Sequence, residues 1–290
     1  MTTSLQNQIQ QFYDASSGLW EQVWGEHMHH GHYGADGTIP KERRQAQIDL
    51  IDELLSWSKV THVTSVLDVG CGIGGSSLYL AEKFGAAATG ITLSPVQARR
   101  AEERSLLAKI PATFLVADAL AMPFADNSFD LVWSLESGEH MPDKTQFLSE
   151  CYRVLRPGGT LMLATWCHRE TDMVPLTPRE QKHLNKIYQV YCLPYVISLS
   201  NYAVIAEELG FQAMRTDDWS KAVAPFWAVV VRSAFSWSAL WGLMRSGWTT
   251  IQAALSMGLM QRGYRDGLIT FGVLCAQKPE SDRPQETLGD

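Results

Sequence analysis

The stretch Leu67-Asp68-Val69-Gly70-Cys71-Gly72-Ile73-Gly74-Gly75 decides the fold of this chain. It closes the run Val63–Val69, whose β-branched residues are typical of a buried strand. Glycines directly after a strand allow a tight turn and let a bound molecule approach the backbone closely. The spacing Gly70-x-Gly72-x-x-Gly75 also matches the dinucleotide fingerprint, but that string alone is a weak signal, so the surrounding residues decide which ligand it serves.

Helical and extended patterns alternate along the residues that follow. Helices are predicted over Ser76–Phe84, Pro95–Ala108 and Thr145–Leu155. The second has Ser94 as its N-cap and Pro95 in its first turn. Strands are predicted over Ala86–Thr92, Ala112–Val116, Phe129–Ser134 and Thr160–Trp166. This alternation indicates right-handed βαβ units, and therefore an α/β fold with a mostly parallel, helix-covered sheet.

The alternation breaks after Trp166. The remaining pattern predicts helical segments within 171–200 and a short helix over Tyr202–Leu209. It also predicts a sixth strand over Phe211–Trp219 and a last strand over Leu268–Gln277, with an apolar, Trp-rich stretch over 226–262 between them. The Trp-rich stretch therefore lies between two strands of the sheet, where we expect helices that cover a substrate pocket.

The predicted organisation has five parts: an N-terminal lid segment over 1–40, a cofactor-binding core over 60–170, helical substrate-binding insertions with one core helix and strand over 171–263, the last core strand over 264–278 and a tail over 279–290. The length of 290 residues suits one large domain.

Composition excludes several classes of protein. The net charge is −7 and no Lys/Arg-rich run occurs, so a nucleic-acid partner is not expected. The five cysteines form no CxxC pair, which argues against a disulfide framework and a zinc site. The start carries no secretory signal. Arg232 and several serines interrupt the apolar stretch 226–244, and this favours a pair of helices over a membrane-spanning helix. The sequence does not decide whether the protein contacts the surface of a bilayer. The oligomeric state is not indicated.

Three residues around the glycines argue against a nicotinamide cofactor. Asp68 would repel a pyrophosphate, whereas it can attract the ammonium group of a methionine moiety. Thr92 ends the next strand, where a nicotinamide enzyme usually has Asp, Glu or Arg. Asp118 follows the third strand, where a carboxylate can accept the amino group of an adenine. An NAD-dependent reductase is kept as the alternative from another class.

Three motifs resemble the class I, Rossmann-like S-adenosylmethionine-dependent methyltransferases: Asp68–Gly74, Ala117-Asp118-Ala119 and Arg156-Pro157-Gly158-Gly159. The segment 90–97 is similar to the branch with the cyclopropane synthases, and this implies that Thr92 and Gln97 hold the ribose or methionine end of S-adenosylmethionine. The fold implied is a Rossmann-like sheet with helices on both faces. The predicted cofactor residues are Asp68, Gly70, Gly72, Gly74, Thr92, Gln97, Asp118, Ala119, Ser134, Tyr13 and Tyr33, the two tyrosines belonging to the lid.

A closer resemblance covers nearly the whole chain. Segments 13–20, 24–33, 137–143, 165–169, 218–220, 223–227 and 245–248 look like those of the γ-tocopherol methyltransferases. The resemblance implies S-adenosylmethionine-dependent methylation of a ring carbon of γ-tocopherol, giving α-tocopherol. The short N-terminus does not resemble a plastid transit peptide, so we expect a cytoplasmic protein of a bacterium, in particular a cyanobacterium. The same template includes plant enzymes that methylate indole alkaloid nitrogens. N-methylation of an indole-type molecule, methylation of a quinol precursor and a non-catalytic lipid-binding module therefore stay open.

Methylation of a phenol calls for a base near its hydroxyl, because a phenol has a pKa of about 10 and its anion is the better nucleophile. The base is predicted among Glu136, Glu139 and His140, just after the fourth strand. The predicted acceptor-binding residues are Trp20, His168, Phe226, Trp227, Trp237, Trp241 and Trp248. The histidines of segment 27–32 are expected to form part of the lid, and no metal is predicted, because a sulfonium donor needs none.

Overall fold

The computed structural model describes residues 7, 10, 11, 14, 21, 25–234 and 257–280, without the side chains of 231–234. The predicted site residues Tyr13, Trp20, Trp237, Trp241 and Trp248 lie outside the described residues.

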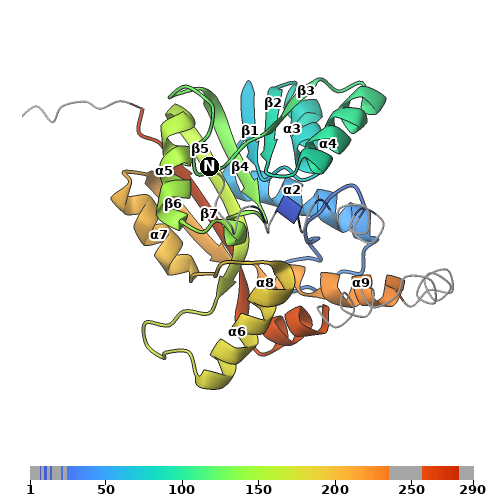
Figure 1. The fold of residues 1–290 in the computed structure, drawn as a ribbon, viewed down its shortest axis with the longest axis vertical. Coiled ribbons are helices and arrows are strands. Elements are labelled where there is room, and N and C mark those ends of the chain that lie inside the picture. The colour runs from blue at the N-terminus through green and yellow to red at the C-terminus, as the bar shows by residue number, and fades with distance from the viewer. Residues whose placement is uncertain are drawn as a thin grey trace, which may run out of the picture.

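The described chain contains a seven-stranded sheet in the order β3-β2-β1-β4-β5-β7-β6 (Figure 1). Its strands are β1 Ser65–Val69, β2 Ala87–Thr92, β3 Ala112–Val116, β4 Phe129–Leu135, β5 Leu155–His168, β6 Gln212–Asp218 and β7 Ile269–Gln277. Strands β1 to β5 pair in parallel, and β7 pairs antiparallel with both β5 and β6. The sequence prediction of a mostly parallel α/β sheet is confirmed.

The strands are connected mainly through helices. These are α2 Arg43–Ser58, α3 Gly75–Phe84, α4 Pro95–Ala108, the 3-10 turn η1 Gly138–His140, α5 Lys144–Val154, α6 Pro178–Tyr191, α7 Leu199–Glu208, α8 Ser220–Val223 and α9 Pro225–Ala234. Residues 257–265 are also helical and lead into β7.

Alternate side chains of the strands point to opposite faces, and each face has its own core. Val66 and Trp133 belong to a core shared with α2, α6, α9 and the helix 257–265. Their neighbours Leu67 and Val132 belong to a second core shared with α5 and α7. Helices therefore cover both faces of the sheet, as predicted, and all of its central strands are buried.

The predicted elements of the first half lie where expected. The ranges of α4 and β3 match the prediction, and the Ser94 side chain caps α4 by accepting from the Gln97 N–H at 3.1 Å. Strand β5 is longer than predicted at both ends: it begins at Leu155, which was predicted to end the preceding helix, and it continues to His168. Helix α2 was not predicted, although Ala46, Leu50 and Leu54 repeat at helical spacing and are buried.

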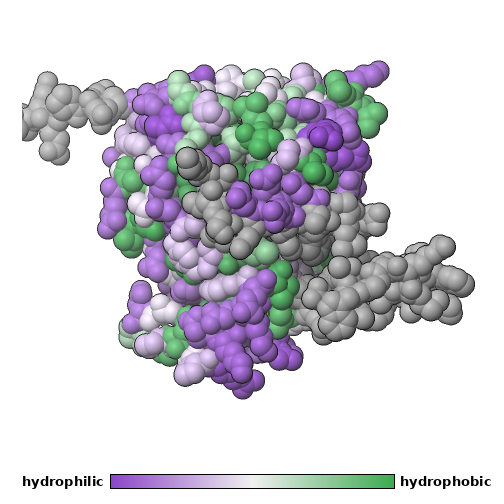
Figure 2. Space-filling model, viewed as in Figure 1, coloured by the Kyte–Doolittle hydropathy of each residue, from purple (hydrophilic) through white to green (hydrophobic). Residues whose placement is uncertain are grey.

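The second half contains helices on one face of the sheet. Leu184 and Ile187 of α6 lie in the same core as Met260 and Tyr264 of the helix 257–265. The opposite side of α6 is exposed, and Figure 2 shows hydrophilic side chains gathered over it. Within the described ranges, we find no helix with both the length and the apolar character that a membrane crossing requires.

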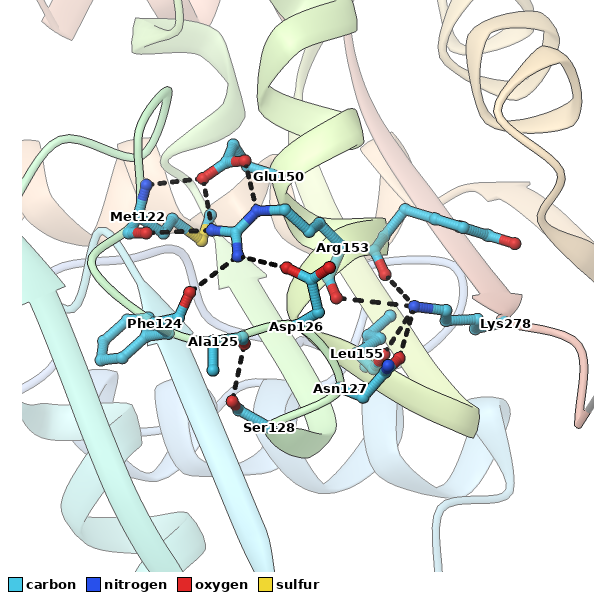
Figure 3. Close-up of polar contacts among 11 residues, drawn as sticks. Met122, Phe124, Ala125, Asp126, Asn127, Ser128, Glu150, Arg153, Leu155 and Lys278 are labelled. Carbon is cyan, nitrogen blue, oxygen red and sulfur yellow. Dashed lines mark hydrogen bonds and ion pairs between the residues drawn. The ribbon is translucent and has the colours of Figure 1, made fainter.

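The loop between β3 and β4 is fastened to α5, and this fixes the residues that leave β3. Arg153 donates to the carbonyl oxygens of Phe124 at 2.7 Å and Met122 at 2.9 Å, and it pairs with Asp126 and Glu150 (Figure 3). Glu150 in turn accepts the Met122 N–H at 2.6 Å. The Arg153 guanidinium thus donates hydrogen bonds to several carbonyl and carboxylate groups of the loop at once. In a loop without this arginine, those groups would have to hydrogen-bond to water.

A matched pair of leucines tests the core assignment. Leu148 on α5 is fully buried, whereas Leu106 on α4 is 79% exposed. We expect Leu148→Ala to lower the free energy of unfolding by about 2–5 kcal/mol, because it removes buried methyl groups and leaves a cavity. Leu106→Ala should change it by less than about 0.5 kcal/mol. Urea denaturation measures both, and equal losses would contradict the assignment.

Candidate active site at the carboxyl edge of the sheet

A cavity opens at the carboxyl ends of the parallel strands, where open α/β sheets bind ligands. Four places in the sequence form its wall: the glycine turn after β1, the end of β2, the residues after β3 and the residues after β4. Residues 26–29 of the N-terminal segment, together with Trp166 and Tyr191, complete the lining. Segments more than a hundred residues apart therefore meet in one site.

The glycine turn adopts a conformation that L side chains disfavour. Gly70, Gly72 and Gly74 have φ angles of 81°, 53° and 80°. A Cβ atom at Gly70 would lie 2.2 Å from the Cβ of Ser137, so the turn packs tightly against the residues after β4. The Gly70 and Cys71 N–H groups donate to the Ile91 carbonyl at 2.9 and 3.0 Å, which ties the turn to β2.

Asp68 places a buried carboxylate in the cavity wall. It is 3% exposed, and its Oδ2 accepts from Ser77 Oγ at 2.6 Å. Burial raises the pKa of Asp68 to about 7, because the fold offers the charge little compensation. No cation of the described residues forms an ion pair with it. A positively charged ligand therefore fits this position.

The end of β2 presents a polar pair to the same cavity. Thr92 Oγ1 donates to Gln97 Oε1 at 2.8 Å, and both side chains are buried. Ser94, the cap of α4, also lies on the lining. These groups offer hydroxyl and amide functions of the kind that bind sugar hydroxyls or an amino-acid end.

Asp118 and Ala119 line the cavity beyond β3. One carboxylate oxygen of Asp118, Oδ1, accepts the Leu120 N–H at 2.9 Å, which fixes the orientation of the side chain. The side chain is half-buried. The carboxylate can therefore accept a further donor, such as the amino group of an adenine.

The N-terminal segment covers one side of the cavity with Glu26, Met28 and His29. Arg104 of α4 donates to the carbonyl oxygens of Glu26 and Ile73, both at 2.9 Å, so it connects this segment to the glycine turn. The segment is therefore an integral wall of the cavity in this structure.

Glu136 is the most strongly held residue of the site. It has a φ of 54°, unusual for a residue with a side chain, and such a backbone costs on the order of 1–3 kcal/mol. Its carboxylate accepts from the His30 N–H at 2.5 Å, His30 Nδ1 at 2.8 Å and Trp166 Nε1 at 3.0 Å. Burial opposes its charge, but His30 attracts the carboxylate and holds the pKa of Glu136 below its ordinary value.

Glu139 and His140 sit on η1 beside a buried lysine. Thr165 Oγ1 donates to Glu139 at 2.7 Å, and Lys144 Nζ donates to the carbonyl oxygens of Gly138 and Glu139 at 2.8 and 3.0 Å. Burial, then the charge of Glu136, raises the pKa of Glu139 to about 8. Burial, then Lys144, lowers the pKa of His140 to about 3. Near pH 7 Glu139 is thus largely protonated and His140 neutral.

Most of the predicted and described site residues meet in this cavity. Those on its lining are Asp68, Gly70, Gly72, Thr92, Gln97, Asp118, Ala119, Glu136, Glu139 and His140. Gly74 is not on the lining, but its positive φ shapes the turn, and a Cβ there would lie 2.8 Å from the Phe114 ring.

The other predicted and described residues lie behind the cavity wall or away from it. Ser134 Oγ lies 2.7 Å from Ser137 Oγ, behind the glycine turn. Tyr33 is buried in the core with α2 and does not border the cavity. His168 is also absent from the lining. Phe226 and Trp227 lie one layer further out, with ring centroids 4.9 and 5.1 Å from His30.

The sequence placed His29 in the lid but missed several other lining or supporting residues: Met28, Ser137, Trp166, Tyr191 and Lys144. Trp166 and His29 belong to segments that resemble the γ-tocopherol methyltransferases, and this resemblance could have indicated that they lie in the site. Tyr191 and Lys144 occur in ordinary amphipathic helices, and nothing in their sequence surroundings indicated a place in the site.

Among the residues that the structure describes, no group of three or more His, Cys, Asp or Glu side chains could hold a metal ion.

The chain is similar to known methyltransferases. Residues 67–163 match the family model of the methyltransferase domain. The chain is 50% identical over 96% of its length to a probable chloroplastic tocopherol O-methyltransferase of Oryza sativa subsp. japonica, covering 79% of that protein. It is 36% identical to the 2-methyl-6-phytyl-1,4-hydroquinone methyltransferase of Synechocystis, over 89% of this chain and 83% of that protein. It is also 36% identical to an ajmaline N-methyltransferase of Rauvolfia serpentina, over 94% of this chain and 98% of that protein.

Solved structures share the fold. The [4+2]-cyclase SpnF has a TM-score of 0.79 at 25% identity, with 97% and 98% of the two chains covered. The geranyl diphosphate C-methyltransferase of Streptomyces coelicolor, in complex with S-adenosyl-L-homocysteine, has a TM-score of 0.76 at 19% identity, with 96% and 99% covered.

These similarities decide against the reductase that the glycine spacing left open, and the cofactor is S-adenosylmethionine. With half of its residues shared with a tocopherol methyltransferase over nearly its whole length, the chain belongs to the S-adenosylmethionine-dependent methyltransferase family that includes the tocopherol methyltransferases.

Proposed function

We propose that this chain methylates a ring carbon of γ-tocopherol and so produces α-tocopherol. The observation that carries the proposal is a single cavity in which a buried anion, Asp68, lies with the aromatic side chains of Trp166 and Tyr191. The 50% identity with a relative named as a tocopherol O-methyltransferase supports the acceptor class. The ring carbon, rather than the phenolic oxygen, is the site that our proposal specifies.

The chain's own residues would bind the cofactor from three strands. Asp68 would attract the cationic methionine end, Thr92 and Gln97 would bind hydroxyl groups, and Asp118 would accept the adenine amino group. When bound, S-adenosylmethionine supplies a methyl group on a positively charged sulfur. The glycine turn lets the backbone approach the ligand closely, and rigid positioning of the two reactants contributes much of the rate acceleration in such transfers.

The other end of the cavity suits an apolar aromatic ring. Leu135, Met141, Trp166 and Tyr191 contribute apolar and aromatic surface there, which favours a chromanol over a sugar or phosphate. An isoprenoid tail would gain about 0.8 kcal/mol for each buried methylene. Phe226 and Trp227 support this wall from behind, through their packing on His30.

Charges at the acceptor end limit which residue can act as a base. Glu139 is largely protonated near pH 7, so it is suited to donate a hydrogen bond. Glu136 is ionised but already accepts three hydrogen bonds. His140 is neutral, but its neighbour Lys144 opposes the positive charge that a general base must take up. We therefore assign Glu136 and Glu139 the role of orienting neighbouring side chains in the site. We place His140 next to the bound acceptor.

Two other acceptors remain candidates because specific relatives favour them. The hydroquinone methyltransferase and the ajmaline N-methyltransferase are both 36% identical to this chain. A quinol precursor has the same hydroxyl and apolar tail as a tocopherol, and an indole-type nitrogen would need no base of comparable strength.

The acceptor is tested with methyl-labelled S-adenosylmethionine and a panel of γ-tocopherol, a methylphytylquinol and an indole amine. We expect the highest kcat/KM with γ-tocopherol, with the label on a ring carbon in the NMR spectrum of the product. Label on oxygen would contradict the proposed position. A preference for the quinol or the amine by more than about tenfold, or 1.4 kcal/mol, would contradict the proposed acceptor.

Asp68→Asn should weaken cofactor binding and stabilise the free protein. The folded pKa of about 7 lies above the ordinary 3.8, so the folded chain binds the Asp68 proton more tightly than the unfolded chain. Wild-type stability should therefore fall between about pH 4 and 7 by up to about 1.4 kcal/mol per pH unit relative to the variant. Urea denaturation at several pH values measures this difference, and calorimetry measures cofactor affinity.

Asp172→Asn, at an exposed loop carboxylate, is the matched control for Asp68→Asn and should follow the wild type in both measurements. If the free energy of unfolding of the wild type had the same pH dependence as that of Asp68→Asn, the buried charge of Asp68 would not destabilise the folded protein.

Asp118→Ala should raise the Kd for S-adenosylmethionine by about 10- to 150-fold, the loss expected for a hydrogen bond to a charged group. Asp118→Asn keeps an oxygen for the Leu120 N–H, so it separates loss of the ligand contact from disorder of the loop. Isothermal titration calorimetry gives both values. An unchanged Kd for the alanine variant would remove Asp118 from the cofactor site.

A further inference from the structure

The loop between β5 and α6, residues 169–177, presents apolar side chains to solvent. Met173 is 92% exposed and Val174 is 60% exposed. Leu176, near the end of the loop, packs against the core that contains α6. Figure 1 shows the loop at the lower end of the molecule, next to the start of α6. Met173 and Val174 do not line the cavity, so the proposed reaction gives them no task.

Hydrogen bonds from one arginine hold the backbone of this loop. Arg169 donates to the carbonyl oxygens of Val174 at 2.6 Å and Pro175 at 3.0 Å, and it forms an ion pair with Glu180 of α6 at 2.8 Å. The loop is therefore fastened to the helix that follows it. Because this backbone is held, Met173 and Val174 are kept in water, where exposed apolar surface is unfavourable until a partner covers it.

Helix α6 carries a stripe of basic residues directly after the loop. Arg179, Lys182 and Lys186 are exposed, and their spacing places them on one face of the helix. None of the three forms an ion pair with a residue in the described part of the chain. The acidic residue of α6, Glu180, is already paired with Arg169.

The acidic residues of the loop do not cancel this stripe. Glu170 accepts the N–H of Ser200, at the start of α7, at 3.1 Å. Asp172 is left as a single exposed negative charge against three positive charges. In a chain with a net charge of −7, the stripe is a local excess of positive charge, which attracts anionic partners.

The loop leaves the sheet at the same edge as the cavity. Strand β5 pairs in parallel with β4, so its carboxyl end at His168 lies at the edge where the cavity opens. Helix α6 then leads from the loop to Tyr191 on the cavity lining. Another exposed apolar pair, Leu106 and Leu107, lies at the opposite edge, because the end of α4 leads into the start of β3.

We propose that the 169–177 loop and the basic stripe of α6 bind the surface of an anionic lipid bilayer. Met173 and Val174 insert among the lipids, and the stripe lies against the headgroups. An apolar insertion and a basic patch are the two signals that together give stable binding at a membrane surface. The choice of a bilayer rests on the proposed function, because an acceptor with an isoprenoid tail resides in lipid and the enzyme has to meet it there.

The apolar part is tested with Met173→Ser/Val174→Ser in sedimentation with lipid vesicles that contain no acceptor. We expect the wild type to bind vesicles of phosphatidylcholine and phosphatidylserine more tightly than vesicles of phosphatidylcholine alone. The double variant should bind the anionic vesicles about 10- to 100-fold more weakly, because two apolar side chains no longer enter the lipid. Leu106→Ser/Leu107→Ser is the matched control and should bind within about twofold of the wild type.

The basic part is tested with Lys182→Gln/Lys186→Gln in the same measurement. Each basic residue near an anionic surface contributes about fivefold to the affinity, so we expect binding about 25-fold weaker than that of the wild type. The remaining affinity should depend less on salt, because fewer charges are screened.

Activity gives a second readout for the apolar variant. With γ-tocopherol held in anionic vesicles, Met173→Ser/Val174→Ser should lose about 10- to 100-fold in kcat/KM, in parallel with its loss of vesicle binding. With a chromanol that lacks the isoprenoid tail, dissolved in water, its kcat/KM should stay within about twofold of the wild-type value, because the cavity is unchanged.

The outcomes separate the two proposals. A wild type that does not bind anionic vesicles, or a Met173→Ser/Val174→Ser variant that binds them as the wild type does, would overturn the membrane surface alone. A wild type that self-associates in light scattering, through a contact that this variant abolishes, would show a second copy on the loop instead of lipid. A wild type that binds vesicles as expected but methylates no phenol would overturn the proposed function and leave the membrane surface standing.

Discussion

The site depends on one backbone constraint, the turn that leaves β1 through glycines with positive φ angles. In this conformation the N–H groups of Gly70 and Cys71 reach the Ile91 carbonyl, and Ser137 packs directly on the turn. The contact leaves no room for a side chain at Gly70. It also joins the ends of β1, β2 and β4 into one wall of the cavity.

Electrostatics then give the carboxyl groups around the cavity different states. Asp68 is buried and forms no ion pair with any cation in the described part of the chain, which suits the binding of a cationic donor. Glu136 is ionised because His30 and Trp166 hold it, and Glu139 is largely protonated because burial and the charge of Glu136 oppose its ionisation. Groups of similar intrinsic acidity thus differ in protonation near pH 7, and the surrounding donors and charges decide how.

The fold does not decide the chemistry on this scaffold. A cyclase, SpnF, shares the architecture with a TM-score of 0.79. In the present chain, three distant segments bring His29, Glu136 and Trp166 together on the cavity lining. Helices α6 and α9 and the helix 257–265 share one core with Trp166, so the second half of the chain supports the cavity wall from outside.

The sequence by itself determined the sheet, the glycine turn and the residues at the strand ends, because local patterns such as β-branched runs, caps and glycine spacing act over short distances. Asp68, Thr92 and Asp118 could be placed for that reason: each follows or closes a recognisable strand. Only the tertiary structure decided that Tyr33 turns into the core, that Ser134 supports the turn from behind, and that His30 holds Glu136 across 106 positions. Such pairings depend on how helices pack over a sheet, and burial changes the acidity of a side chain in ways that no short stretch of sequence encodes.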